Sequence, residues 1–166
     1  MEIVIRAREP QDAAAYQRLY SHPDVYPWTL QLPFPSVALW EKKFARMDAE
    51  GFVAFVAEID GVLAGELTLF VDSKPRTRHC ISFGLGVHPD FAGRGVGERL
   101  IRTAMNYARN WLGITRMELE VFHDNERALR LYQRLGFERE GMKRQAALRD
   151  GQLRDVVMMA KLLNDA

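Results

Sequence analysis

A glycine-rich turn that leads into a long amphipathic segment is the feature that most constrains the fold of this chain. The turn spans residues 93–97, in the sequence Gly-Arg-Gly-Val-Gly, and follows an apolar run that ends at Val87. Apolar residues then recur at steps of three and four from Val96 to Trp111, and Gly113 ends the pattern. These residues predict a strand, a tight turn and a long helix in succession. Because backbone N–H groups of such a turn and of a helix N-terminus converge on an anion, a phosphate or pyrophosphate ligand is expected there.

Two other phosphate-binding motifs fit this turn poorly. A Walker loop ends in Gly-Lys-Ser or Gly-Lys-Thr, whereas Glu98 stands here and its carboxylate would repel a phosphate. A dinucleotide fingerprint needs a glycine at that position and begins at the strand end, but five residues separate Val87 from Gly93. An acidic residue about twenty positions further on, Glu118 or Glu120, keeps the dinucleotide alternative open. The simplest alternative is that the glycines only make a turn.

The remaining sequence alternates between strand-like and helix-like segments. Strands are predicted at residues 4–6, 52–59, 62–71, 80–87 and 117–122, with two weaker ones between 137 and 157. Helices are predicted after residues 10–12, after Ser36, at 96–111 and at 125–135. Asp60 and Gly61 form a strong hairpin signal between two of the strands. This order predicts a mixed α/β architecture with antiparallel pairs as well as strand-helix-strand units.

Residues 22–35 interrupt this regular pattern. The segment contains four prolines and the aromatic residues Tyr26, Trp28 and Phe34. Such a segment shapes a pocket in some proteins and is a surface crossover in others, and both interpretations stay open.

A second group of residues, at 125–137, adds to the glycine turn. At 100° per residue, Asn125, Ala128 and Tyr132 share one helical face, and the first and last are separated by roughly 10 Å along the axis. This stripe is suited to hold an elongated amide-containing ligand at one end and to place a proton donor at the other. Taken alone, Asn125 is also a typical helix cap and Tyr132 a typical half-buried core residue.

Composition and charge exclude several classes of function. A chain of 166 residues corresponds to about one domain, and 23 Lys+Arg against 22 Asp+Glu create no strong overall field that would attract nucleic acid or anionic lipid, although a local basic patch stays open. The single cysteine, Cys80, makes neither an intramolecular disulfide nor a thiolate-rich metal site. No apolar run approaches the roughly 18 residues that span a bilayer, and the N-terminus lacks the plan of a signal peptide. We therefore expect a cytoplasmic protein without a nucleic-acid, membrane or metal partner.

The two groups of residues together resemble the GNAT superfamily of N-acetyltransferases, in which such a turn and such an Asn…Tyr helix bind acetyl-CoA. The resemblance covers about residues 2–163. Within residues 137–159 it is closest to the bacterial branch of ribosomal-protein alanine and L-amino-acid N-acetyltransferases, through Glu140-Gly141, Asp150-Gly151, Asp155 and Met158. It implies the GNAT fold, an α/β (α+β) arrangement with a mixed, mostly antiparallel twisted sheet of about seven strands and about four helices. One such domain would occupy residues 1–166, and a homodimer is compatible with the resemblance.

The resemblance also implies residue roles. Backbone groups of Leu85, Gly86 and Val87 would hold the acetyl-pantetheine arm, Asn125 would bond to the pantetheine, and Tyr132 would protonate the departing thiolate. The pyrophosphate would lie on the turn formed by Ala92, Gly93, Arg94, Gly95, Val96 and Gly97. The family turn usually begins with Gln or Arg where this chain has Ala92, but that position contributes mainly through its backbone, so acetyl-CoA binding is still expected.

The general base is less clear from the sequence. Glu120 stands five residues before Asn125, as the proposed base does in the ribosomal alanine branch, and is the predicted base. The alternative is an exposed strand carboxylate without a catalytic role. Other members place an acid on the preceding strand, where this chain has Ser82, which is no strong base. His79 and Glu66 are two further candidates.

The implied reaction is direct acetyl transfer from acetyl-CoA to a primary amine, with no metal. A neutral amine attacks the thioester carbonyl, backbone N–H groups stabilise the oxyanion, and Tyr132 supplies the proton. The expected acceptor is the α-amine of an L-amino acid or a small analogue. A protein N-terminus of the ribosomal type is the second hypothesis, and a non-catalytic acyl-CoA sensor is the third.

Overall fold

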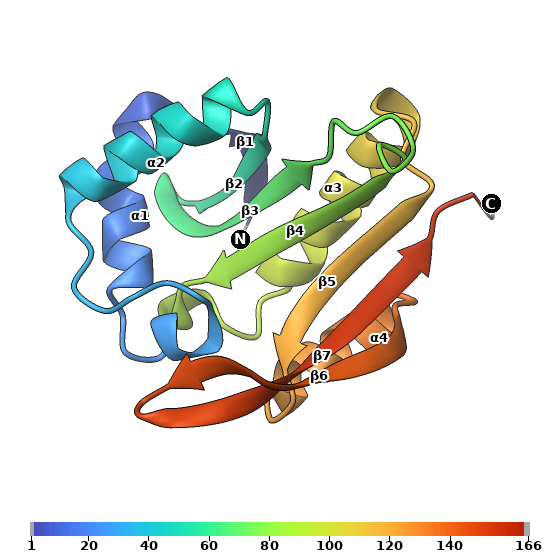
Figure 1. The fold of residues 1–166 in the computed structure, drawn as a ribbon. Coiled ribbons are helices and arrows are strands. Elements are labelled where there is room, and N and C mark those ends of the chain that lie inside the picture. Colours follow the sequence, from blue (N-terminus) through green and yellow to red (C-terminus); the bar gives the residue numbers. More distant parts are fainter. Residues whose placement is uncertain (1, 165–166) are drawn as a thin grey trace.

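The computed structural model describes residues 2–164, and its seven strands form one sheet in the order β1-β2-β3-β4-β5-β7-β6 (Figure 1). The strands are β1 (Ile3–Ala7), β2 (Val53–Ile59), β3 (Val62–Val71), β4 (Cys80–Val87), β5 (Arg116–Phe122), β6 (Glu138–Arg149) and β7 (Gln152–Leu162). The helices are α1 (Ala13–Tyr20), α2 (Val37–Ala49), α3 (Val96–Trp111) and α4 (Glu126–Arg134), with short 3-10 turns at Pro10–Asp12, Tyr26–Trp28 and Pro89–Phe91. The predicted fold is confirmed. The predicted domain, residues 1–166, extends past the described residues at both ends.

Local chemistry explains the boundaries. The β2–β3 turn has positive φ at both central residues, Asp60 (52°) and Gly61 (77°), which is the geometry that a tight hairpin requires. Ser36 caps α2 by accepting a hydrogen bond from the Leu39 N–H at 3.0 Å. The predicted weak strands after residue 137 form one long hairpin, β6 and β7, around Asp150 and Gly151, which also have positive φ.

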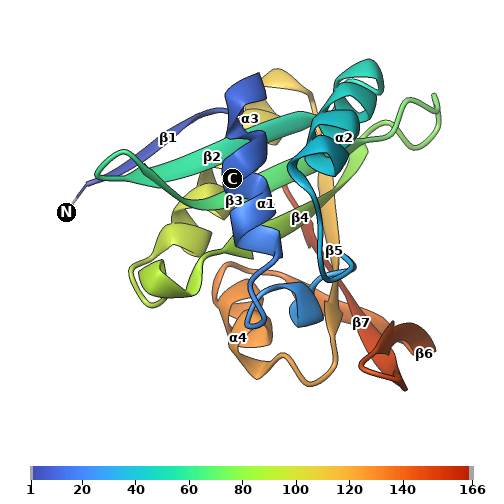
Figure 2. The ribbon, with the colours of Figure 1, turned by 90° about the vertical axis from the view of Figure 1, so that its left-hand side faces the viewer.

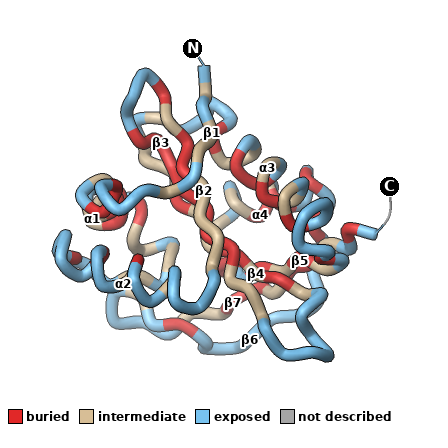
Figure 3. Tube along the Cα trace, turned by 90° about the horizontal axis from the view of Figure 1, so that it is seen from above, coloured by how far each residue is buried: buried red, intermediate tan, exposed pale blue. Residues whose placement is uncertain are grey.

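Helices cover both faces of the sheet (Figures 1 and 2). Leu67 and Leu69 on β3 belong to the main core with α3 and α4, whereas the alternating residues Glu66 and Thr68 face away from it. A second core, formed by α1 and α2 with Val56, covers that other face. Buried residues therefore lie along β3 and β4 and on the sides of the helices that face the sheet, while β6 is almost entirely exposed (Figure 3).

The two central strands separate part-way along their length. Among the strands of residues 2–164, β4 and β5 are the one parallel pair, and they pair only at their N-terminal ends, from Cys80 with Arg116 to Ser82 with Glu118. Beyond Ser82 the strands diverge, which is plain in Figure 1. The β4 backbone groups that face β5 there have no strand partner, so they are available to a ligand.

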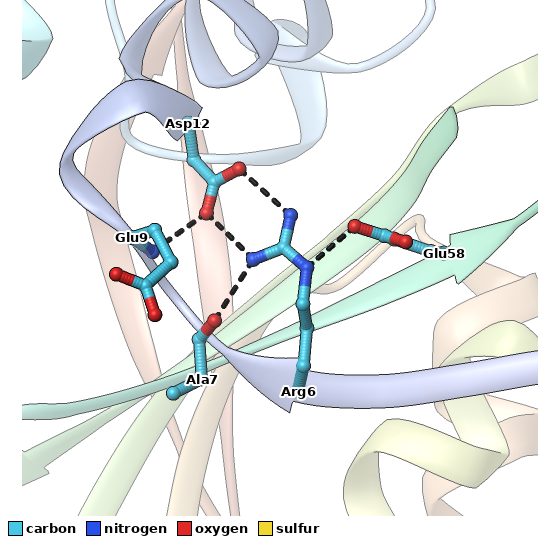
Figure 4. Close-up of polar contacts among 5 residues, drawn as sticks. All are labelled: Arg6, Ala7, Glu9, Asp12 and Glu58. Atoms are coloured by element: carbon cyan, nitrogen blue, oxygen red, sulfur yellow. Dashed lines mark hydrogen bonds and ion pairs between the residues drawn. The ribbon is translucent and has the colours of Figure 1, made fainter. Parts of the chain in front are cut away.

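An ion-pair network fixes the start of α1 (Figure 4). The Arg6 guanidinium donates to both carboxylate oxygens of Asp12 at 2.8 Å and also pairs with Glu58 on β2. Asp12 in turn accepts the Glu9 N–H at 2.7 Å. Burial by itself would raise the pKa of Asp12, but the hydrogen bonds and positive charge of the Arg6 guanidinium hold that pKa below its ordinary value. The network thus sets the direction of α1, the helix that carries Tyr16 and Tyr20 to the sheet.

Candidate active site

A cavity of about 1580 Å³ occupies the space opened by the divergence of β4 and β5. Its walls come from β3, β4, β5, α4 and the β6–β7 hairpin, from the turn before α3, and from the connection between α1 and α2. The predicted cofactor residues that line it are Leu85, Gly86, Val87, Ala92, Gly93, Gly95, Val96, Gly97 and Asn125. The predicted catalytic residues Tyr132 and Glu120 line it as well. Arg94 is the exception, and its guanidinium lies 5.6 Å from the ring centroid of Phe91.

The glycine turn and the N-terminus of α3 form one end of the cavity. Gly93 and Gly95 have φ of 76° and 80°, a conformation that glycine adopts without strain. The first four N–H groups of α3 have no partner within the helix, so they are suited to an anion. Glu98, whose charge would oppose a phosphate, is ion-paired with Arg134 of α4 at 3.4 Å. The pair reduces the repulsion at this end.

Asn125 is the N-cap of α4 and still keeps donors for a ligand. Its Oδ1 accepts the Ala128 N–H at 3.2 Å. The cap uses the carbonyl oxygen of the amide, so the two hydrogens of the NH₂ group remain to be donated into the cavity. The capping role and the proposed ligand role of Asn125 are therefore compatible.

Tyr132 lies on the same helix and is 8% exposed. Its ring meets those of Phe83 and Phe137 edge-on, at centroid distances of 6.0 and 5.9 Å. No described side chain donates a hydrogen bond to its hydroxyl or accepts one from it, and burial raises its pKa well above the ordinary value of 10.0. Tyr132 is therefore protonated at neutral pH and has a proton to donate to a leaving group beside it.

Glu120 lies on β5 and also lines the cavity. Its side chain is 46% exposed and forms an ion pair with Lys143 of β6, which also lines the cavity. The pair raises the pKa of Lys143. Glu120 is thus an exposed carboxylate that already has a cationic neighbour.

Glu66 presents a different environment. It is 4% exposed, lies on the cavity wall, and accepts hydrogen bonds from the hydroxyls of Thr68 at 2.9 Å, Tyr16 at 3.2 Å and Tyr20. Burial raises its pKa to about 7, against the lowering effect of the three hydroxyls. The sequence pattern ranks Glu66 behind Glu120 and does not single out Tyr16, Tyr20 or Thr68. A carboxylate in the middle of an apolar strand run is the one available signal.

Ser82 and His79 lie at the N-terminal end of β4 and differ in their access to the cavity. Ser82 lines the cavity, whereas His79 does not and is exposed ahead of the strand. Among residues 2–164 no three or more side chains of His, Cys, Asp and Glu are grouped as they would be to hold a metal.

The segment between α1 and α2 forms another part of the cavity wall. Trp28 lines the cavity and lies under the guanidinium of Arg149 from the β6–β7 hairpin, at 4.7 Å from the ring centroid. Arg149 is also paired with Asp124 at 3.1 Å. Figures 1 and 2 show this segment beside the end of the hairpin. The interpretation of residues 22–35 as a pocket-forming segment agrees with this arrangement.

The fold and the cavity together define an acetyltransferase. The chain belongs to the Acetyltransferase (GNAT) family, whose family model matches residues 13–137. It is 40% identical over 161 residues to the L-amino acid N-acetyltransferase AaaT of Escherichia coli (strain K12), covering 97% of this chain and 98% of that protein. It is 26% identical over 158 residues to the spermidine N(1)-acetyltransferase of the same organism, covering 95% of this chain and 84% of the relative.

A solved structure has the same fold over the whole chain. The acetyltransferase yncA from Salmonella typhimurium, determined with acetyl-CoA, matches with a TM-score of 0.86 at 22% identity. The match covers 100% of this chain and 96% of that one. None of the helices within residues 2–164 has the length and apolar character needed to cross a bilayer.

Proposed function

We propose that this protein transfers an acetyl group from acetyl-CoA to the α-amine of an L-amino acid or a small analogue. The observation that carries the proposal is the continuous cavity, which runs from the α3 N-terminus past Asn125 to Tyr132. A long ligand with an anion at one end and a thioester at the other matches that sequence of groups. The residues present therefore fit acetyl-CoA.

The proposed roles follow the chemistry of each wall. The turn at residues 92–97 and the α3 N-terminus hold the pyrophosphate, and Asn125 donates to the pantetheine amides. Unpaired β4 backbone groups at residues 85–87 hold the acetyl-pantetheine arm and stabilise the oxyanion as the amine attacks. Tyr132 donates its proton to the departing thiolate. Glu120 and Glu66, both on the cavity wall, are the two candidates for the base that receives the proton of the amine.

The acceptor side of the cavity supports an amino acid as substrate. The exposed pair of Glu120 and Lys143 presents a negative and a positive group together, which complements the ammonium and carboxylate of an amino acid. An exposed ion pair has a small net free energy, so its partners exchange readily for those of a zwitterion. Arg116, a second cation on this wall, is already held by both Glu118 and Glu140. The 40% identity to an L-amino acid N-acetyltransferase agrees with this proposal.

Two other functions receive less support. A protein N-terminus would need an open groove at the acceptor end, where Trp28 and Arg149 are in contact. A non-catalytic sensor would have no use for the unpartnered phenol of Tyr132. Cytoplasmic location is part of the proposal, and the homodimer stays a prediction that sedimentation equilibrium would check.

The first test is ligand binding measured by thermal shift. Acetyl-CoA should raise Tm, because a ligand that binds only the native state at about 100 times its Kd adds about 2.7 kcal/mol to the free energy of unfolding. NAD and ATP at the same concentration should not. Stabilisation by NAD alone would contradict the acetyl-CoA site.

The second test is release of coenzyme thiol with acetyl-CoA and a panel of acceptors. The panel contains L-amino acids, their decarboxylated amines and short peptides with free N-termini. Turnover should be fastest with L-amino acids. Preference for the peptides would favour the protein acetyltransferase, and no turnover with any amine would favour the sensor.

A further inference from the structure

The cluster of Glu66 with three hydroxyls lies directly beside the strand that is proposed to hold the thioester. Glu66 on β3 is the antiparallel partner of Gly86 on β4. A Cβ on Gly86 would lie 2.8 Å from the Tyr20 hydroxyl oxygen, so that hydroxyl fills the space where a side chain would be. The carboxylate and its donor thus lie next to the backbone at residues 85–87.

The hydrogen bonds leave the carboxylate one position for a further donor. Oε2 accepts from Tyr16 and Thr68, and Oε1 accepts from Tyr20. A carboxylate has about four lone-pair positions. One position on Oε1 therefore remains, on a residue that lines the cavity.

We propose that Glu66 is the catalytic base of the acetyl transfer, which receives a proton from the ammonium of the acceptor at this remaining position. Tyr16, Tyr20 and Thr68 are positioning residues that fix the carboxylate. Glu120 then binds the acceptor by ion pairing and does not take its proton. This inference rests on the proposed function.

The proton and bond changes balance. The ammonium loses one proton to Glu66, and the nitrogen lone pair then forms a bond to the thioester carbonyl carbon. The carbon–sulfur bond breaks, and the thiolate takes the proton of Tyr132. The attacking nitrogen, which carries a positive charge after the attack, gives up a second proton and becomes the neutral amide nitrogen, and this proton restores the phenol of Tyr132. Glu66 releases its proton to solvent, so one proton is produced for each acetyl group transferred.

The groups around Glu66 favour proton exchange near neutral pH. Tyr16 and Tyr20 face it from α1, Thr68 from its own strand and Gly86 from β4, and all of these are uncharged because burial raises the pKa of both tyrosines. Arg8, which follows β1, is the cation that acts on it and favours its ionised form. Burial outweighs these influences and raises its pKa to about 7. A carboxyl with that pKa is about half ionised at pH 7, so it can bind and release a proton there.

The test is the pH dependence of kcat/KM for wild type and the variants Glu66→Gln, Glu120→Gln and Tyr20→Phe, with the best L-amino acid of the panel. Wild-type kcat/KM should rise with pH through about 7. Glu66→Gln should lose at least about 100-fold at pH 7, and the loss should shrink toward pH 9.5, where free amine is abundant. Glu120→Gln should raise KM, and the factor by which it rises should not change with pH. Glu50→Gln, an exposed change outside the cavity, is the matched control and should change neither parameter.

Tyr20→Phe provides a second readout that does not depend on the folding of Glu66→Gln. Loss of one donor to the ionised carboxylate should move the rising limb of the profile to higher pH. The proposal is overturned by a Glu66→Gln profile parallel to that of wild type, or by a pH-dependent loss in Glu120→Gln instead. A Tyr20→Phe profile of kcat/KM that rises at the same pH as that of wild type also counts against the proposal. If wild type acetylates no amino acid but does acetylate spermidine, the substrate class fails and the same comparison is made with spermidine. Failure with every amine overturns both proposals.

Discussion

The hydroxyl of Tyr20 occupies the space that a Cβ on Gly86 would fill, at 2.8 Å from its ideal position. Tyr20 cannot move aside easily, because its ring is stacked on Trp40 at a centroid distance of 4.9 Å and the residue is 4% exposed. The Tyr20 phenol on α1 therefore fits against β4 only because residue 86 has no side chain. This phenol connects the strand beside the proposed thioester with the buried carboxylate of Glu66.

Gly86→Ala should therefore reduce activity by displacing Tyr20 from Glu66. We expect kcat/KM to fall at least about tenfold, with a loss of about 1–3 kcal/mol in the free energy of unfolding from overpacking. Steady-state kinetics and urea denaturation would measure the two effects. Gly84→Ala on the same strand is the control, because its Cβ would lie 3.4 Å from the ring of Phe70, an ordinary contact. Equal losses in the two variants would show that the effect of Gly86→Ala does not depend on Tyr20.

Tyr132→Phe should separate chemistry from packing. The ring stays between Phe83 and Phe137, and no hydrogen bond to a described side chain is lost, so the unfolding free energy should change by less than about 0.5 kcal/mol. Loss of the proton donor should lower kcat by about 10²–10⁴-fold when chemistry limits the rate. Tyr107→Phe, which alters a phenol packed on Phe55 outside the cavity, is the matched control. A kcat within a few fold of wild type would make Tyr132 a packing residue.

The strength of local sequence signals explains how much of the fold was predictable. The boundaries of β4 and α3 and the cap at Asn125 agree with the structure because glycines, a capping side chain and clear periodicity mark them. The long β6 was predicted only weakly, since an edge strand that is exposed along nearly its whole length lacks a regular apolar pattern.

The candidate site was predictable where it is local in sequence, and not where it depends on tertiary contacts. The turn at residues 92–97 and the stripe from Asn125 to Tyr132 each lie within one short segment. The surroundings of Glu66 join residues 46 and 50 positions apart along the chain, Tyr20 and Tyr16, through the packing of α1 on the sheet. The hydrophobic periodicity of a sequence predicts helices and strands, but it does not predict contacts between residues so far apart along the chain. The same holds for the pair of Glu120 and Lys143, which depends on the register of β5, β7 and β6.

Lys143→Gln should weaken binding of substrates that carry a carboxylate. If Lys143 exchanges Glu120 for the substrate carboxylate, KM for an L-amino acid should rise about tenfold, and KM for its decarboxylated amine should not rise. The comparison of those two substrates in wild type and variant is the measurement. Lys42→Gln on the exposed side of α2 provides the control. A parallel rise in both KM values would show that Lys143 acts on the structure of the site and not on the carboxylate.

Asp12→Asn should destabilise the protein through the start of α1. The change removes the charge that faces the fork of Arg6, and a buried charged hydrogen bond of this kind is expected to contribute about 1–3 kcal/mol. Because the pKa of Asp12 is lowered in the folded state, its contribution is present above about pH 4 and is lost as pH falls through that lowered value. Urea denaturation at pH 7 and pH 3 would test both statements. Glu58→Gln, which removes the more exposed partner of Arg6, should cost less than about 1 kcal/mol.

The free energy of unfolding should also report the ionisation of Glu66, with a sign opposite to that of Asp12. Its pKa is about 7 in the folded protein and near 4.5 when the chain is unfolded, so between these values the folded state binds the extra proton. Stability from this residue is therefore greatest below pH 4.5 and declines as pH rises to 7. The total decline is about 3 kcal/mol, at about 1.4 kcal/mol for each unit of pKa difference.

Glu66→Gln has no charge to bury, so the difference in unfolding free energy between wild type and this variant should change by that amount between pH 4.5 and pH 8. Glu120→Gln, at an exposed position, should follow the wild-type curve. Parallel curves for wild type and Glu66→Gln would mean that the carboxylate ionises at its ordinary pH, and the base proposed for the reaction would then lack its basicity.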